Sequence, residues 1–163
     1  QILVLQAQGI GKGDAILIWM IVGPAQAAAR FAELVFAHKH SIYTTALASA
    51  VLTTASFLAF LPFGVSITTA IVFSFAIGFG HGLFAIARNT LPLTLFGARD
   101  YGSYMGLLMV PQNIVNATAP VIFAWLIARV SPMAAMWFAA AAAFAGFLAV
   151  LALISACRRP VSA

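Results

Sequence analysis

The sequence predicts an all-α membrane protein, a polytopic helical bundle with five full transmembrane helices plus a truncated one. Of its 163 residues, 64% are hydrophobic and 7% are charged, against about 45–50% and about 25% in an ordinary soluble domain. Eight Lys or Arg and three Asp or Glu cannot cover a water-facing surface. The charge-free runs also match the roughly 20 apolar residues that cross a bilayer. The lipid bilayer is therefore the expected solvent and partner.

Composition excludes several other classes of protein. A disordered chain contains far fewer apolar residues than this one. A disulfide scaffold needs several cysteines, whereas Cys157 is the only one here. The net charge of +5 comes from basic residues scattered singly among apolar runs, so we expect no nucleic-acid partner.

The N-terminal part predicts one incomplete and one complete helix. Residues 1–8 are apolar but too short to cross, so we interpret them as the end of a truncated helix. They lack the basic start and cleavage site of a signal peptide, and the chain does not begin with Met, so we expect a piece of a longer protein. The first full span falls near 15–37.

The next two spans come from one long uncharged run. Residues 41–87 contain no Lys, Arg, Asp or Glu, and a helix of that length would measure about 70 Å, twice what a bilayer needs. The sequence Leu61-Pro62-Phe63-Gly64 breaks it. We expect spans near 42–61 and 66–88.

The last two spans follow a predicted loop over residues 90–102, which contains Pro92, Gly97, Gly102 and the charged pair Arg99-Asp100. Spans are expected near 103–128 and 133–155, with 156–163 as a tail.

Alternate loops place the basic residues unequally. One side collects Lys39, Arg88, Arg99, Arg158 and Arg159, and the other collects Lys12 and Arg129. The positive-inside rule makes the richer side cytoplasmic. We therefore expect a multi-pass protein of the inner (plasma) membrane with a cytoplasmic C-terminus.

The first span carries a polar stripe. Trp19, Gly23, Gln26, Arg30 and Glu33 recur at steps of three and four, which places them on one helix face. Charged residues at membrane depth usually face a bundle interior or a water-filled cavity. Two interpretations stay open: Arg30 and Glu33 pair with each other at the boundary, or they belong to a functional stripe that Gln26 extends toward the midplane.

The third span has a similar face, with Ser74, Gly78, His81, Ala85 and Arg88. His81 is either a proton carrier or a structural histidine. The glycines at 78, 80 and 82 predict close helix packing.

The fourth span carries the amides Gln112, Asn113 and Asn116, beside Pro111 and Pro120. Amides are costly in lipid, so they should face inward. The hydroxyls of the second span can bond to their own helix, and the fifth span is apolar and predicted to face lipid. Neither a metal site nor a catalytic set emerges, since His38-Lys39-His40 lacks a nearby acidic or thiol partner. We expect no enzyme, no metal and no cofactor.

The pattern resembles the C-terminal half of a major facilitator superfamily transporter, from the end of helix seven through helices eight to twelve. The matching segments are Gly23-Pro24-Ala25-Gln26 with Arg30 and the basic turn at 38–41, the glycine-rich span leading through Arg88 to Leu91-Pro92 and Phe96-Gly97, and Arg99-Asp100-Tyr101-Gly102 with Gly106. The resemblance implies a cavity lined by helices seven, eight, ten and eleven, alternating access, and an N-terminal six-helix half as partner.

The leading functional hypothesis is secondary active transport of a small solute, coupled to protons. Candidate cavity residues are Gln26, Arg30, His81, Gln112, Asn113 and Asn116, and candidate coupling or gating residues are Glu33, His81, Arg88, Arg99 and Asp100. The unchanging charge of Arg30 favours an organic anion. Two alternatives are efflux of drugs or metabolites, with Trp19, Met105 and Met109 shaping an apolar pocket, and a small membrane assembly subunit.

Overall fold

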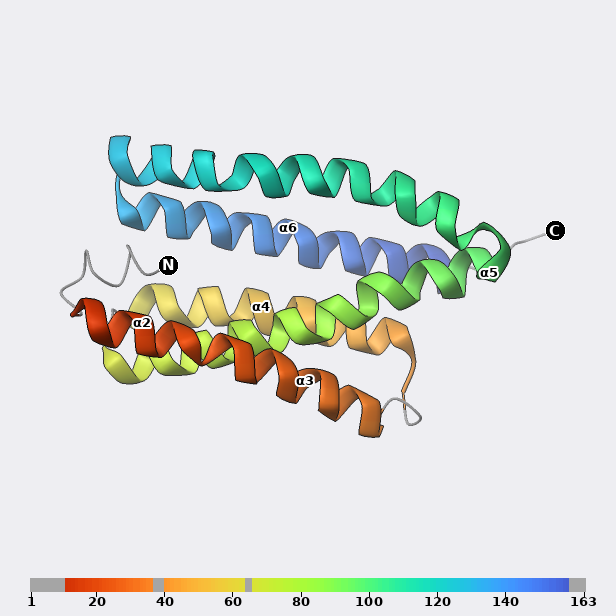
Figure 1. The fold of residues 1–163 in the computed structure, drawn as a ribbon, viewed down its shortest axis with the longest axis horizontal. Coiled ribbons are helices and arrows are strands. Elements are labelled where there is room, and N and C mark those ends of the chain that lie inside the picture. Colours follow the sequence, from red (N-terminus) through yellow and green to blue (C-terminus); the bar gives the residue numbers. More distant parts are fainter. Residues whose placement is uncertain (1–10, 37–39, 64–65, 159–163) are drawn as a thin grey trace.

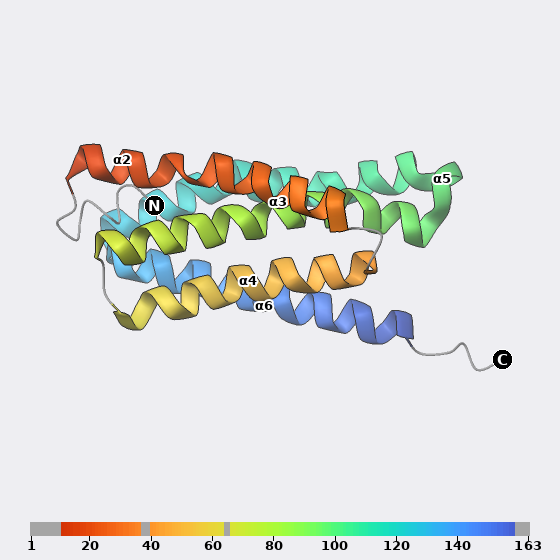
Figure 2. The same cartoon turned by 90° about the horizontal axis from the view of Figure 1, so that it is seen from below.

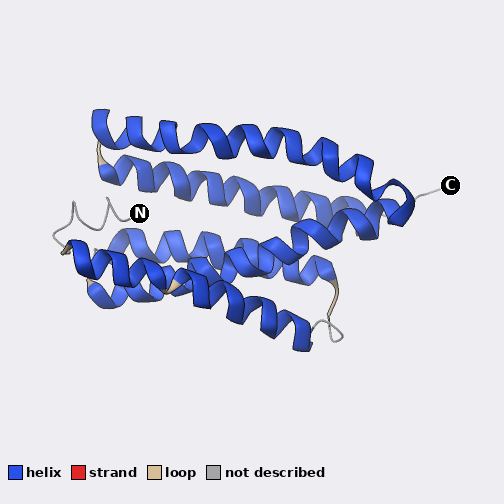
Figure 3. Cartoon of the chain, in the orientation of Figure 1, coloured by secondary structure: helices blue, strands red, loops and turns tan. Residues whose placement is uncertain are grey.

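The structure is a computed structural model that describes residues 11–36, 40–63 and 66–158. Its helices are α2 (Lys12–Met20), α3 (Val22–Phe36), α4 (Ile42–Phe63), α5 (Ile67–Arg129) and α6 (Pro132–Arg158). Every regular element in these residues is a helix (Figure 3), which confirms the all-α prediction. The truncated helix expected at 1–8, His38, Lys39 and the tail beyond Arg158 lie outside the described residues.

Within the described residues, four helices are long and apolar enough to cross a membrane. They are Lys12–Phe36, Ile42–Phe60, Ile67–Arg129 and Pro132–Cys157. The first joins α2 and α3 through Ile21, whose carbonyl oxygen still accepts a bond from the Ala25 N–H at 3.0 Å. Helices of this length and composition are typical of a membrane protein.

The break predicted before residue 66 is present. α4 ends at Phe63 and α5 begins after Ser66. The Ser66 hydroxyl accepts a bond from the Thr69 N–H at 3.2 Å, while the Ser66 N–H donates to Thr69 Oγ1 at 2.9 Å. This reciprocal capping box satisfies backbone groups that a helix start leaves unpaired.

The loop predicted over 90–102 is wrong, because helix occupies both sides of a single non-helical residue. Gly97 has φ 73° and ψ 171°, a conformation that essentially glycine alone adopts. Figure 1 shows α5 reversing direction within its 63 residues. We call 67–96 the first arm and 98–129 the second arm. Pro92 is tolerated within the first arm, as prolines are in membrane helices.

Contacts across the turn hold the two arms together. The Tyr101 hydroxyl donates to the Asn89 carbonyl oxygen at 3.1 Å, and the rings of Phe96 and Tyr104 stack with centroids 4.0 Å apart. The turn therefore has side-chain support on both arms.

The first arm packs between α3 and α4, and α6 runs beside the second arm (Figures 1 and 2). A Cβ atom added at Gly78 would lie 2.7 Å from the Val22 carbonyl oxygen, and one at Gly82 would lie 2.6 Å from Ala29 Cβ. One at Gly80 would lie 2.7 Å from Thr53 Oγ1 of α4. Only glycine permits these approaches, so the predicted close helix packing is confirmed.

The main apolar core lies near the N-terminal end of the first arm. Phe73 contacts Phe60 and Phe57 of α4, with ring centroids 4.4 Å and 5.3 Å apart. Residues of α2 and α6 complete this cluster, including Ala15, Ile18 and Met136. It ties the ends of α2, α4, α5 and α6 into one body.

The opposite end gathers the elements that carry most of the candidate charged residues. Figure 1 shows the C-terminal end of α3, the start of α4, the turn of α5 and the end of α6 at one end of the bundle. Tyr43 at the start of α4 and Cys157 at the end of α6 lie close enough for their side chains to interact, which agrees with that view.

Candidate functional site

Glu33 is a buried carboxylate that joins α3 to α4. Its Oε1 accepts a hydrogen bond from the Thr45 hydroxyl at 2.5 Å, and its Oε2 lies 3.2 Å from His40 Nε2. Its residue is only 8% exposed. The last turns of α3 and the first turn of α4 are thus linked through one acid.

The pair of Arg30 and Glu33 that the sequence left open is absent from the described residues. The basic side chain that Glu33 contacts there is His40, whose Nε2 lies 3.2 Å from Oε2. Arg30 is exposed and has no ion pair or hydrogen bond with another described residue. The charge of Arg30 is therefore available to a group from outside.

Arg30 and Glu33 share a groove of about 360 Å³ between α3, the start of α4 and the first arm of α5. Its other lining residues are Leu34, His40, Ile42, Ile86 and Thr90. The groove combines a guanidinium, a carboxylate, an imidazole and a hydroxyl with aliphatic walls, which suits an amphipathic ligand or one with a small polar group.

His81 lies in a different groove, between α4, the first arm and α6. That groove measures about 200 Å³ and includes Ser49, Thr53, Phe84 and Phe147 among its lining residues. Ser49 donates to the Ala46 carbonyl oxygen at 2.8 Å, so its hydroxyl is already satisfied within α4. Arg30 and His81 consequently serve two separate hollows, although both belong to the predicted cavity set.

The amides of the second arm are exposed or half-buried. Asn113 and Asn116 are exposed and Gln112 is half-buried, and no side-chain hydrogen bond links them to other described residues. Gln26 on α3 is likewise half-buried, and its backbone, including the carbonyl oxygen, faces Gly82 of α5. These four side chains do not converge on Arg30 or His81 in a hollow of this chain.

Arg88 differs from Arg30, Arg99 and Arg129 in being half-buried. Its Nε is shielded from solvent and has no hydrogen-bond partner in the described part of the chain. Because the first arm continues to Phe96, Arg88 lies about 13 Å from the turn rather than at a helix end. Arg99 and Asp100, by contrast, are exposed just after Gly97.

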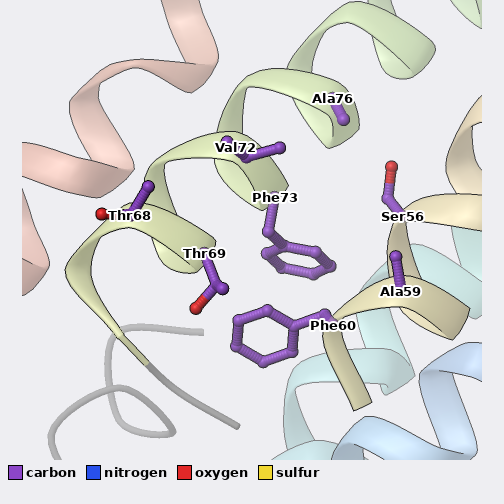
Figure 4. A pocket seen from close by; sticks show the side chains of 8 residues that line it. All are labelled: Ser56, Ala59, Phe60, Thr68, Thr69, Val72, Phe73 and Ala76. Carbon is purple, nitrogen blue, oxygen red and sulfur yellow. The ribbon is translucent and has the colours of Figure 1, made fainter. Parts of the chain in front are cut away.

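Another hollow, of about 220 Å³, is apolar in character. Figure 4 shows the neighbouring rings of Phe60 and Phe73 in its lining, together with Ser56 and Thr69. The Ser56 hydroxyl donates to the Leu52 carbonyl oxygen at 2.6 Å, so it offers no free donor. We assign no chemistry to this hollow.

Sequence reasoning missed Thr45 and His40 as partners of Glu33. From the sequence, the hydroxyls of the second span are expected to bond within their own helix, and His40 is expected to lack a nearby acidic partner. Only the arrangement of α3 and the start of α4 on the first arm of α5 brings Thr45 and His40 to the acid. In the described residues, no three His, Cys, Asp or Glu side chains lie close enough to hold a metal ion.

Comparison with protein-family models, with curated proteins and with solved structures finds no match to this chain.

Proposed function

We propose that this chain is part of a secondary active transporter that moves a small solute across the inner membrane by alternating access, coupled to protons. In this proposal α5 crosses twice, once with each arm, so the described helices make five crossings. The chain would form most of the C-terminal half of a transporter of the major facilitator type, and an N-terminal half would close the cavity. The resemblance of its motifs to that family supports this arrangement.

The observation that carries the proposal is the set of polar side chains on otherwise apolar helices. His81, Asn113 and Asn116 are exposed, and none has a hydrogen-bond partner among the described residues. Hydrocarbon cannot satisfy such groups, so they require water or another protein surface. A water-filled path closed by a second half supplies both.

The solute class follows from the unpaired arginines. Glu33 is engaged by Thr45 and His40, and Arg88 is left with a shielded Nε that lacks a partner in the described residues. A half-buried guanidinium whose Nε–H lacks an acceptor favours an anion. We therefore propose an organic anion as solute and Arg88 as the residue that binds it.

The test is proton-driven flux through the complete protein in liposomes, with pooled carboxylates compared against pooled lipophilic cations. We expect carboxylate flux in the native protein and at least a tenfold loss in Arg88→Gln, because about 1.5–3 kcal/mol attaches to a charged hydrogen bond. Arg129→Gln, an exposed arginine at the other end of the second arm, is the matched control. Cation flux indifferent to Arg88 would instead identify an efflux transporter of lipophilic compounds.

A further inference from the structure

The groove beside Arg30 has the features of a lipid headgroup site. It opens at the end of the bundle where α3 ends and α4 begins, and its volume of about 360 Å³ accommodates a phosphate with part of a headgroup. A basic side chain in a groove between helices at a membrane boundary can hold an anionic headgroup by charge and shape. We propose that this groove binds the phosphate of an anionic phospholipid, with Arg30 as the residue that contacts it.

The charge of Arg30 is free for this purpose. The carboxylate in the groove, Glu33, has both oxygens engaged, one by Thr45 at 2.5 Å and the other by His40 at 3.2 Å. Arg30 has no anionic partner in the described residues. A guanidinium binds phosphate oxygens through two parallel N–H bonds, a geometry that a lysine does not reproduce.

The neighbouring side chains favour a lipid over a soluble anion. Leu34 lines the groove and is 77% exposed, and Phe31, next to Arg30, is 69% exposed. Arg30 lies six residues before the end of α3, about 9 Å along the helix, and a long arginine side chain can extend from there to the headgroup region. Acyl chains can therefore cover Phe31 and Leu34 while the phosphate meets Arg30.

The orientation expected from the sequence agrees with an anionic occupant. This end of the bundle then faces the cytoplasmic leaflet, where anionic lipids attract basic residues by about 1 kcal/mol each. Lipid binding at this groove does not depend on transport, so its test is independent of the test of the proposed function.

Native mass spectrometry of the complete protein tests the proposal. The protein is released from nanodiscs of phosphatidylcholine that contain a minority of phosphatidylglycerol, and retained phosphatidylglycerol is counted. We expect Arg30→Gln to retain about fivefold less, the equivalent of about 1 kcal/mol. Arg30→Lys should fall between it and the native protein. Arg129→Gln, the matched exposed arginine at the opposite end, should retain the native amount.

Two further arms separate a lipid from a free anion and from a folding defect. Leu34→Gln keeps the guanidinium but removes apolar surface, so we expect less retained phosphatidylglycerol, and inorganic phosphate should not displace the lipid. The unfolding temperature of Arg30→Lys and Arg30→Gln in detergent should match the native one. Two results would overturn the proposal. One is undiminished retention of phosphatidylglycerol by Arg30→Gln. The other is displacement of phosphatidylglycerol from the native protein by inorganic phosphate, down to the amount that Leu34→Gln retains.

Discussion

Glu33 shows how a single acidic residue can be stable inside an apolar bundle. Burying a charge is costly unless hydrogen bonds replace its hydration, and Glu33 receives such bonds from Thr45 and His40. Its position near the end of α3 lets both partners come from the segment that follows. The acid therefore links two helices that the short connection at 37–39 also joins.

The link between Glu33 and Thr45 should be measurable as a coupling energy. In a double-mutant cycle of Glu33→Leu, which removes the acceptor, and Thr45→Val, which removes the donor, we expect a coupling of about 1.5–3 kcal/mol in the free energy of unfolding, because the bond involves a charged acceptor. Reversible unfolding in mixed detergent micelles gives the four values. The neighbouring Thr44→Val, at an exposed hydroxyl, is the control and should couple to Glu33→Leu by less than about 0.5 kcal/mol.

The glycines facing α3 carry a second residue-scale prediction. A Cβ at Gly82 would lie 2.7 Å from the Gln26 carbonyl oxygen and 2.6 Å from Ala29 Cβ, so Gly82→Ala must push α3 and α5 apart. We expect this variant to lower the free energy of unfolding by about 1–3 kcal/mol. Gly106→Ala meets nothing within 4 Å and should be neutral or stabilising. Equal unfolding free energies for the two variants would contradict the packing described here.

At the scale of elements, the sequence predicted some helix ends and missed others for physical reasons. Leu61-Pro62-Phe63-Gly64 marked the end of α4 correctly, and Ser66 begins α5 with a cap that short-range signals encode. Around Pro92, the same signals predicted a loop that is helix. Proline and charged pairs interrupt helices in water, whereas neighbouring helices satisfy the freed backbone groups in a bundle. Only Gly97 needs a conformation outside the helix.

Gly97 therefore tests the turn between the two arms. Its φ of 73° with ψ of 171° belongs to a region that costs an L-residue about 1–3 kcal/mol. We expect Gly97→Ala to destabilise the protein by that amount. Gly102→Ala, five residues later in a helix and in open space, should gain up to about 1 kcal/mol. The opposite signs, read from thermal unfolding in detergent, distinguish strain at the turn from a general effect of removing glycine.

At the scale of the whole molecule, the sequence assigned polar residues to spans but could not place them around the bundle. Periodicity puts His81 and Arg88 on one face of a helix, yet it does not say which neighbours that face meets. The structure turns His81 toward α4 and α6 and opens Arg30 into a groove beside α4. The partners of Glu33 depend on packing between helices, which no short-range pattern records.

The reversal of α5 at Gly97 predicts on which side of the membrane each end of the second arm lies. If both arms of α5 cross the bilayer, Ala98 lies on the same side as Cys157, and Val130, at the end of the second arm, lies on the opposite side. In a Cys157→Ala background, we expect a membrane-impermeant maleimide to label Ala98→Cys from the cytoplasmic side and Val130→Cys from the other. Both positions are exposed, so access does not limit the reaction. The protein that keeps its native Cys157, which is also exposed, is labelled in parallel. It provides the reference for the cytoplasmic side in sealed vesicles of either orientation. Labelling of Ala98→Cys and Val130→Cys from one side would mean that the second arm does not cross, which would remove the amides of that arm from any transmembrane path.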